Sequence, residues 1–244
     1  MIQNIAFISD IHYGSTDEPE RSNITEFMKM ATETDIGAVI VPGDLTSHGY
    51  DGEIIGECMW RLFGKHNFWC IGGGEVDELH MLKQKFIKPL EDAKKPIFLC
   101  HGNHDTYNGA GREPVLDYID ERYGGIPYRR DINTIVGTLS IYVCGLYPDE
   151  TARRFLEKDL VHNINDIIIV FHYSLDSNWW SDAEKEEFRN VIRSNIHIRA
   201  IAVGHSHTSS ISTWNGYMVI NASGTEFALL NLHNMEAKLL KRGA

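Results

Sequence analysis

The sequence is poor in cysteine, and the few cysteines that it has are far apart. Cys58, Cys70, Cys100 and Cys144 show no CxxC spacing. Such scatter fits free thiols in a reducing compartment better than a disulfide framework or a cysteine zinc site. We therefore expect ordinary buried side chains at these positions rather than a functional cysteine cluster.

Long hydrophobic runs and a leader pattern are also missing. No stretch of about 18 apolar residues occurs, which is the shortest run that suggests a transmembrane helix. The first residues, MIQNIAFISD, lack the basic start, apolar middle and small-residue cleavage site of a signal peptide. We predict a cytoplasmic protein with no membrane partner, and the sequence does not indicate its oligomeric state.

Positive charge is scarce. The 244 residues include 23 Lys and Arg against 34 Asp and Glu, which gives a formal charge of −11. A broad surface that binds a nucleic-acid backbone needs clustered basic side chains, so this balance disfavours a nucleic-acid partner. It leaves room for a local positive site made by metal ions. Internal repeats and low-complexity tracts are absent as well, and we expect a single domain over residues 1–244.

Short apolar runs alternate with helix-like segments, a pattern that indicates a layered α/β domain. The runs that we expect to be buried strands are residues 5–8, 38–41, 97–100, 139–143, 167–171 and 200–203. The expected helices are residues 23–34, 75–90 and 182–193. Strands at 210–213, 217–221, 227–232 and 237–240, with tight turns at Asn215-Gly216 and His233-Asn234, should finish a mixed or antiparallel sheet.

A long connection follows the second expected strand. It contains several aromatic residues, Trp60 and Trp69 among them, and a run of three glycines. Long irregular connections are often lids or binding loops. We predict a lid or binding insertion at about residues 50–92, with a self-packed surface insertion as the alternative.

Five of the apolar runs are followed by side chains of the kind that bind metals. The residues in question are Asp10 and His12, Asp44, Asn103 and His104, His172, and His205 and His207. The carboxyl ends of strands in α/β sheets meet at one edge, where binding sites form. One convergent cluster is therefore expected.

The chemistry of these side chains narrows the choice of metal. Two carboxylates, one amide and several imidazoles suit manganese, iron or zinc better than calcium or an iron–sulfur cluster. The set is too large for one ion. A pair of divalent or trivalent ions about 3.5 to 4 Å apart, bridged by a carboxylate, is the arrangement that activates water for phosphoryl displacement.

These residues also resemble a known family. Asp10-x-His12, Gly43-Asp44, Gly102-Asn103-His104-Asp105, His172 and Gly204-His205-x-His207 are similar to the five motif blocks of the calcineurin-like metallophosphoesterase superfamily. The resemblance extends from residue 10 to residue 207. It implies a four-layer α/β/β/α sandwich, in which two mixed β-sheets pack face to face and helices flank them.

The resemblance also implies roles for individual residues. Asp10, His12 and His207 would hold a first metal, Asn103, His172 and His205 a second, and Asp44 would bridge the two. A hydroxide that bridges the metals would be the nucleophile. His104 would stand beside the metals without binding them and would meet the leaving oxygen. Contacts with a small phosphoester substrate are expected from His48, Asn103 and His104.

The second block indicates which phosphoester is cleaved. Phosphoprotein phosphatases of this superfamily typically have Asp and Arg where this chain has Ser47 and His48. Their absence leaves less fixed positive charge, which suits a diester monoanion better than a monoester dianion. The block GDLTSHG also resembles that of the class III cyclic-nucleotide phosphodiesterases. A phosphomonoesterase or protein phosphatase, a DNA nuclease and a metal-free protein-binding scaffold are the alternatives.

Aromatic residues after His172 are further candidates for substrate contact. Tyr173, Trp179 and Trp180, together with Trp69, could stack on a nucleobase. The alternative for the two adjacent tryptophans is that both pack against the helix that follows them.

Overall fold

The computed structural model describes residues 1–14, 18–33, 35–51, 77–106, 113–193, 195–223 and 226–240. Most of the insertion predicted at about 50–92 lies outside the described residues, and Trp69, Cys58 and Cys70 lie outside them as well. Within the described residues, no helix combines the length and the apolar character needed to cross a membrane.

Strands and helices alternate along the chain until β7, apart from the consecutive strands β4 and β5, and only strands follow β7. The strands are β1 Asn4–Phe7, β2 Ile36–Pro42, β3 Ile97–Cys100, β4 Tyr128–Thr134, β5 Gly137–Val143, β6 Asp166–Val170, β7 Ile198–Val203, β8 Ser210–Trp214, β9 Tyr217–Asn221, β10 Phe227–Asn231 and β11 Glu236–Leu240. The helices are α1 Glu18–Glu33, α3 Glu78–Leu82, α4 Lys88–Asp92, α5 Pro114–Tyr123, α6 Glu150–Leu160 and α7 Asp182–Ile192. A π-helical segment, η1 Lys83–Ile87, joins α3 to α4, and a 3-10 turn, η2, covers His104–Thr106.

The strands form two mixed sheets. The order in the five-stranded sheet is β11-β10-β1-β2-β3, and the order in the six-stranded sheet is β4-β5-β6-β7-β9-β8. β1, β2 and β3 are parallel to one another, as are β5, β6, β7 and β9. Antiparallel strands complete both sheets, which confirms the mixed sheets that the sequence predicts.

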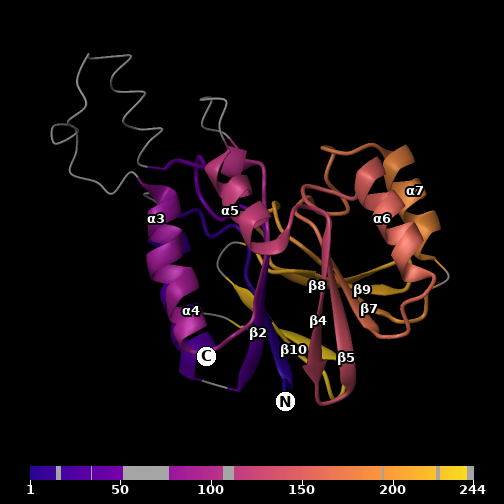
Figure 1. The fold of residues 1–244 in the computed structure, drawn as a ribbon, viewed down its shortest axis with the longest axis horizontal. Helices are drawn as coiled ribbons and strands as arrows, with labels where there is room; N and C mark the ends of the chain where they lie inside the picture. The colour runs from indigo at the N-terminus through magenta and orange to yellow at the C-terminus, as the bar shows by residue number, and fades with distance from the viewer. Residues whose placement is uncertain are drawn as a thin grey trace, which may run out of the picture.

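Helices cover the outer faces of the two sheets (Figure 1). α3 and α4 lie on one flank, and α6 and α7 lie on the other. Alternate residues of β6 show the layering: Ile168 and Val170 belong to the large core that includes the first sheet, whereas Ile167 and Ile169 pack with α6 and α7. This is the four-layer α/β/β/α sandwich implied by the resemblance.

The continuous helical segment formed by α3, η1 and α4 belongs to the main core. Leu79, Leu82, Phe86 and Leu90 are buried in the same cluster as β1 and β2. The last part of the segment 50–92 is therefore a helix of the outer layer that packs its apolar side chains into the main core. Whether the preceding residues form a lid stays a prediction.

The sequence pattern predicts all of the buried strands but misses three other elements. Every strand predicted from an apolar run is present within a few residues. β4, α5 and α6 were not predicted. β4 exposes residues on both faces at the edge of its sheet, and α6 buries only Ala152, Leu156 and Leu160, so neither has a strong apolar signal.

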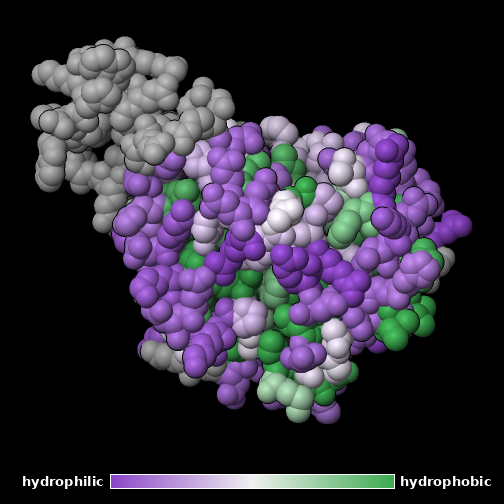
Figure 2. Space-filling view, in the orientation of Figure 1, coloured by the Kyte–Doolittle hydropathy of each residue, from purple (hydrophilic) through white to green (hydrophobic). Residues whose placement is uncertain are grey.

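The surface and the described cysteines agree with the composition. The face drawn in Figure 2 is largely hydrophilic. Cys100 and Cys144 are buried and are not joined in a disulfide. Burial raises the pKa of both thiols, so they are unreactive packing residues.

Candidate metal centre

The candidate site lies where the carboxyl ends of the parallel strands meet. Asp10 follows β1, Asp44 follows β2 and Asn103 follows β3, whereas His172 follows β6 and His205 follows β7. The first three come from one sheet and the last two from the other. The expected convergence is present, because these residues contact one another across the two sheets.

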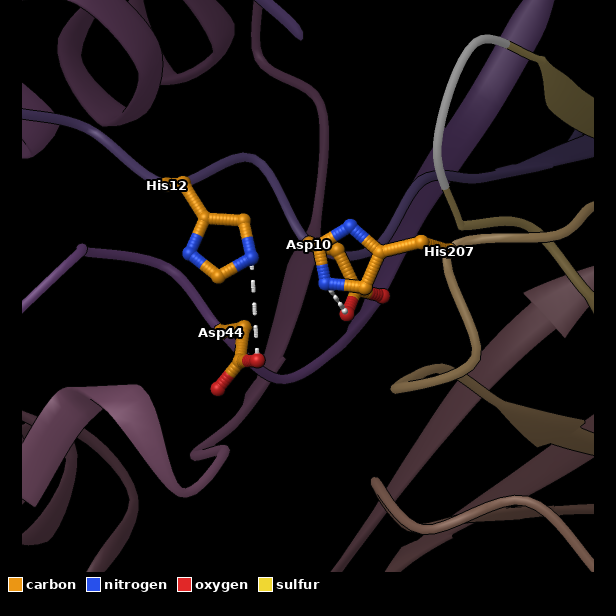
Figure 3. Close-up of side chains that lie close together, drawn as sticks. All are labelled: Asp10, His12, Asp44 and His207. Atoms are coloured by element: carbon orange, nitrogen blue, oxygen red, sulfur yellow. Dashed lines mark ion pairs between the residues drawn. The ribbon is translucent and has the colours of Figure 1, made fainter. Parts of the chain in front are cut away.

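A first group consists of Asp10, His12, Asp44 and His207, which offer ligand atoms that all lie within 4.8 Å of one another (Figure 3). Nε2 of His12 is 3.7 Å from Oδ2 of Asp44, and Nε2 of His207 is 3.6 Å from Oδ1 of Asp10. The rings of His12 and His207 stack with centroids 5.1 Å apart. Three of these four residues are buried, and His207 forms the exposed side of the group.

A second group consists of Asp44, His172 and His205. Oδ1 of Asn103 lies 3.0 Å from Nε2 of His172 and 3.1 Å from Nδ1 of His205. Oδ2 of Asp44 lies 3.3 Å from Nε2 of His172. Asp44 therefore belongs to both groups, which is the position expected for a carboxylate shared by two ions.

The orientation of His172 favours a cation at this place. Its Nδ1 donates to the carbonyl oxygen of Pro42 at 2.8 Å, so in a neutral ring Nε2 carries a lone pair. That lone pair would face the oxygens of Asp44 and Asn103, which is unfavourable unless a cation lies between them or the ring is protonated. Burial alone would lower the pKa of His172, but the Asp44 carboxylate raises it to about 9.

The other buried groups show the same need for positive charge. Burial raises the pKa of Asp10. Both carboxylate oxygens of Asp10 accept from the backbone N–H of His205. Burial would also raise the pKa of Asp44, but the nearby His172 lowers it to about 2. Nε2 of His12 is buried and has no hydrogen-bond partner among the described residues. A metal ion would satisfy this nitrogen and would offset the cost of the buried carboxylates.

The backbone of the site is unusual. Eight described residues other than glycine have a positive φ, and five of them belong to this cluster. They are Asp10, His12, Asp44, His205 and His207, with φ between 44° and 72°. A residue that has a Cβ loses free energy when it adopts the left-handed region. Backbone strain of this kind is concentrated at functional sites. The left-handed conformation of these loop residues thus helps to set the positions of their side chains.

Two glycines allow the loops to approach one another. A Cβ at Gly102 would overlap the carboxylate of Asp44 and its backbone nitrogen. A Cβ at Gly204 would overlap Oγ of Ser9 and crowd the carboxylate of Asp10. Glycine is therefore required at both places by close packing.

Asp105 holds the loop that carries Asp44. Its buried carboxylate accepts hydrogen bonds from the backbone N–H groups of Leu45, Thr46 and Gly102, at 2.8 to 3.2 Å, and from the hydroxyl of Thr46 at 2.8 Å. The sequence places Asp105 in the third motif block, but no pattern indicates that it ties this block to the second.

His104 lies beside the first group. Its ring is 4.7 Å from that of His12, and its backbone N–H donates to Oδ1 of Asp44 at 2.9 Å. Nδ1 of His104 lies 2.9 Å from the backbone carbonyl oxygen of Ser47. This contact needs no carboxylate at position 47, because the peptide oxygen orients the ring. Ser47 also anchors the loop, since its hydroxyl donates to the carbonyl of His12.

His48 is paired with a residue that the sequence analysis did not single out. Nδ1 of His48 is 3.0 Å from Oε1 of Glu78 in α3, and the backbone N–H of His48 donates to Oε2 at 2.8 Å. Glu78 is 3% exposed and also accepts from the N–H of Tyr50. The two residues are 30 positions apart, so no local motif could indicate the pair.

Two mixed sheets with these side chains at one edge define an α/β protein that could hold metal ions between its strand ends. A model of the family described as calcineurin-like phosphoesterase matches residues 3–209. The chain belongs to this family.

Other proteins share part of the sequence or the fold of this chain. The chain is 31% identical over 124 residues to a protein from Colwellia psychrerythraea named as a probable cyclic nucleotide phosphodiesterase, and this match spans 46% of the chain and 43% of that relative. The fold is shared with the protein TT1561 of Thermus thermophilus, at a TM-score of 0.62 and 11% identity over 99% of both chains. It is also shared with a dimetal phosphatase from Danio rerio, at a TM-score of 0.62 and 13% identity over 99% of this chain and 96% of the other.

Proposed function

We propose that this chain hydrolyses a small phosphodiester, such as a cyclic nucleotide, at a site that holds two metal ions. Asp10, His12 and His207 would hold the first ion, and Asn103, His172 and His205 the second. Asp44 would be shared. The observation that carries this proposal is the membership of Asp44 in both groups of ligand-type side chains. The mixed oxygen and nitrogen donors favour manganese, iron or zinc.

Residues of this chain would position the metal ions and the proton donor. When bound, the metal pair would supply an activated water and a positive field for the phosphoryl oxygens. Asp44 would hold the two sites in register, because the Asp105 hydrogen bonds fix its loop. The Ser47 carbonyl orients His104 by accepting from Nδ1–H, so the imidazolium form would give the proton on Nε2 to the leaving oxygen and become a neutral ring that keeps its proton on Nδ1.

The surroundings of His48 support a diester rather than a monoester. The position that would carry a fixed guanidinium in a phosphoprotein phosphatase carries an imidazole, and the nearest acid of that imidazole is the buried Glu78. A carboxylate beside this position would repel a second negative charge on the substrate. If His48 contacts the substrate, it would do so through Nε2, because Nδ1 faces Glu78.

The relative from Colwellia psychrerythraea gives this substrate class further support, although the match covers less than half of either chain. The partner that we propose is therefore a small phosphoester. The cytoplasmic location stays a prediction from the sequence.

Paired substrates test the proposal. Metal-loaded protein should hydrolyse bis-aryl and alkyl-aryl phosphodiesters at a higher kcat/KM than the matching aryl phosphomonoester, and it should cleave 2′,3′- or 3′,5′-cyclic nucleotides. A strong preference for the monoester would overturn the diester assignment. Cleavage of single-stranded DNA alone would favour a nuclease, and no hydrolysis with any divalent metal would favour a scaffold.

A further inference from the structure

Two adjacent tryptophans in the loop between β6 and α7 have opposite environments. Trp180 is 3% exposed and packs against Phe171 and Phe188, with ring centroids 5.7 and 6.2 Å away. Its indole N–H donates to the carbonyl oxygen of Ser174. Trp179 is 61% exposed. Packing therefore accounts for Trp180, as the sequence alternative expects, but it does not account for Trp179.

Trp179 lies next to the candidate metal centre. Its ring centroid is 5.9 Å from that of His205, and the two planes are nearly perpendicular at 84°. It also stacks on Tyr173 at 5.8 Å, and Tyr173 is buried and lies 4.8 Å from the ring of His205. The indole is thus in ring contact with a side chain of the second group.

The exposure of Trp179 is exceptional among the aromatic residues that the structure describes. Of the Phe, Trp and Tyr residues in the described part of the sequence, Trp179 alone is exposed. An indole left in water gives up the free energy that its burial would contribute, so exposed tryptophans are enriched where a partner covers them. Beside a phosphate site, the partner best suited to an aromatic face is a flat ring of the substrate.

We propose that Trp179 is the platform on which the nucleobase of a nucleotide substrate stacks while its phosphate lies at the candidate metal centre. This rests on the proposed function and names its substrate class. In a nucleotide the ribose separates the base from the phosphate, so the base lies just beyond the phosphate site. Trp179 stands at such a place, beyond His205 and at the protein surface.

The platform is held in position before a substrate binds. The backbone N–H of Trp179 donates to the hydroxyl of Ser177 at 3.1 Å, and Tyr173 supports one side of the indole. On the other side of Trp180 the chain enters α7 through a capping box made by Ser181 and Glu184. Because the loop is fixed at both ends, stacking costs little conformational entropy. Since every base has a π-face, the platform should accept different nucleobases.

The test uses adenosine 5′-monophosphate, which is a product of the proposed diester hydrolysis, and ribose 5-phosphate, which has a hydroxyl in place of the base. Both carry the same phosphomonoester, so any repulsion of its charge by the site is common to the two probes. Their binding to the metal-loaded full chain is measured by calorimetry. Trp179→Ala should weaken binding of adenosine 5′-monophosphate by about 5- to 150-fold, which is the range for loss of one base stack. Binding of ribose 5-phosphate should not change. Trp179→Phe should keep most of the affinity for adenosine 5′-monophosphate.

Controls make the outcome decisive. Ile164→Ala removes an apolar side chain that is 83% exposed elsewhere and should change the binding of neither probe. Thermal unfolding of each variant checks the fold, and Trp179→Gln replaces the alanine variant if that variant is unstable. Unchanged affinity for adenosine 5′-monophosphate, an equal loss for both probes, or no binding of adenosine 5′-monophosphate by the wild type overturns the platform.

Failure of the platform and failure of the proposed function give different results. Diester hydrolysis with base binding that does not depend on Trp179 would reject the platform and keep the phosphodiesterase. Base binding that depends on Trp179, without diester hydrolysis, would reject the phosphodiesterase and keep the platform.

Discussion

Replacing Asp44 with asparagine is expected to abolish hydrolysis and to lower the metal content of both sites at once. Asp44 is common to the two groups of ligand-type side chains, and its Oδ2 faces His12 on one side and His172 on the other. The amide keeps the volume and loses the charge that two cations would share. Several kcal/mol of charge stabilisation would be lost, so the rate should fall by about 10³-fold or more.

The measurement combines elemental analysis with initial rates on a phosphodiester. Asp92→Asn is a matched control, because it removes one carboxylate from an exposed pair with Lys88 in α4 that belongs to neither group of ligand-type side chains. It should leave both quantities unchanged. If Asp44→Asn retained full turnover and two bound metals, the shared-ligand assignment would be wrong.

Replacing His104 with alanine is expected to slow the enzyme in a way that depends on the leaving group. His104 is adjacent to His12 and is oriented by the Ser47 carbonyl, but it is not needed to complete either metal group. Proton donation by a positioned side chain typically contributes about 10²- to 10⁴-fold. An alkyl leaving group should show a loss of about this size, whereas an activated aryl leaving group needs little protonation and should lose far less.

Rates on a series of diesters with leaving groups of increasing pKa test this prediction, and metal content is measured alongside. The metals should stay bound. His162→Ala, which removes an exposed histidine after α6, is the matched control and should leave the series unchanged. Equal slowing of all substrates would assign His104 a role in binding or folding instead of proton transfer.

The buried part of the fold is predictable because its signal is local. An apolar run such as residues 97–100 ends in a polar block, and β3 covers the same residues. Tight turns are equally local: Asn215 and Gly216 both have positive φ, as the hairpin between β8 and β9 requires. β4 and α6 are different, since their polar residues face solvent and only the partner elements determine where they pack.

The residues of the candidate site also fall into those that the sequence predicts and those that it does not. Asp10 and His172 lie within three residues of the ends of apolar strands, so the topology of parallel strands suffices to predict that they converge. Glu78 and Asp105 act through hydrogen bonds to loops that are 30 and 60 positions away, which no spacing rule can detect. The difference between Trp179 and Trp180 depends on which side of one loop faces the core, and only the packing against Phe188 decides it.

The clustering of positive φ values at the candidate site is a finding that the sequence could not indicate. Aspartate and histidine adopt the left-handed region more readily than β-branched residues do, but nothing in the sequence marks five such residues in one cluster. These left-handed residues lie at the strand ends, where the ligand-type side chains gather. This placement is an observation about the backbone that agrees with the side-chain contacts.

The most direct test of the central claim is the number of metal ions that one wild-type chain binds when activity is complete. Metal-free protein is titrated with manganese, iron or zinc, and bound metal and phosphodiester hydrolysis are followed together. Two ions per chain are expected, with full activity only when the second is bound. Full activity with one ion or none would contradict the account.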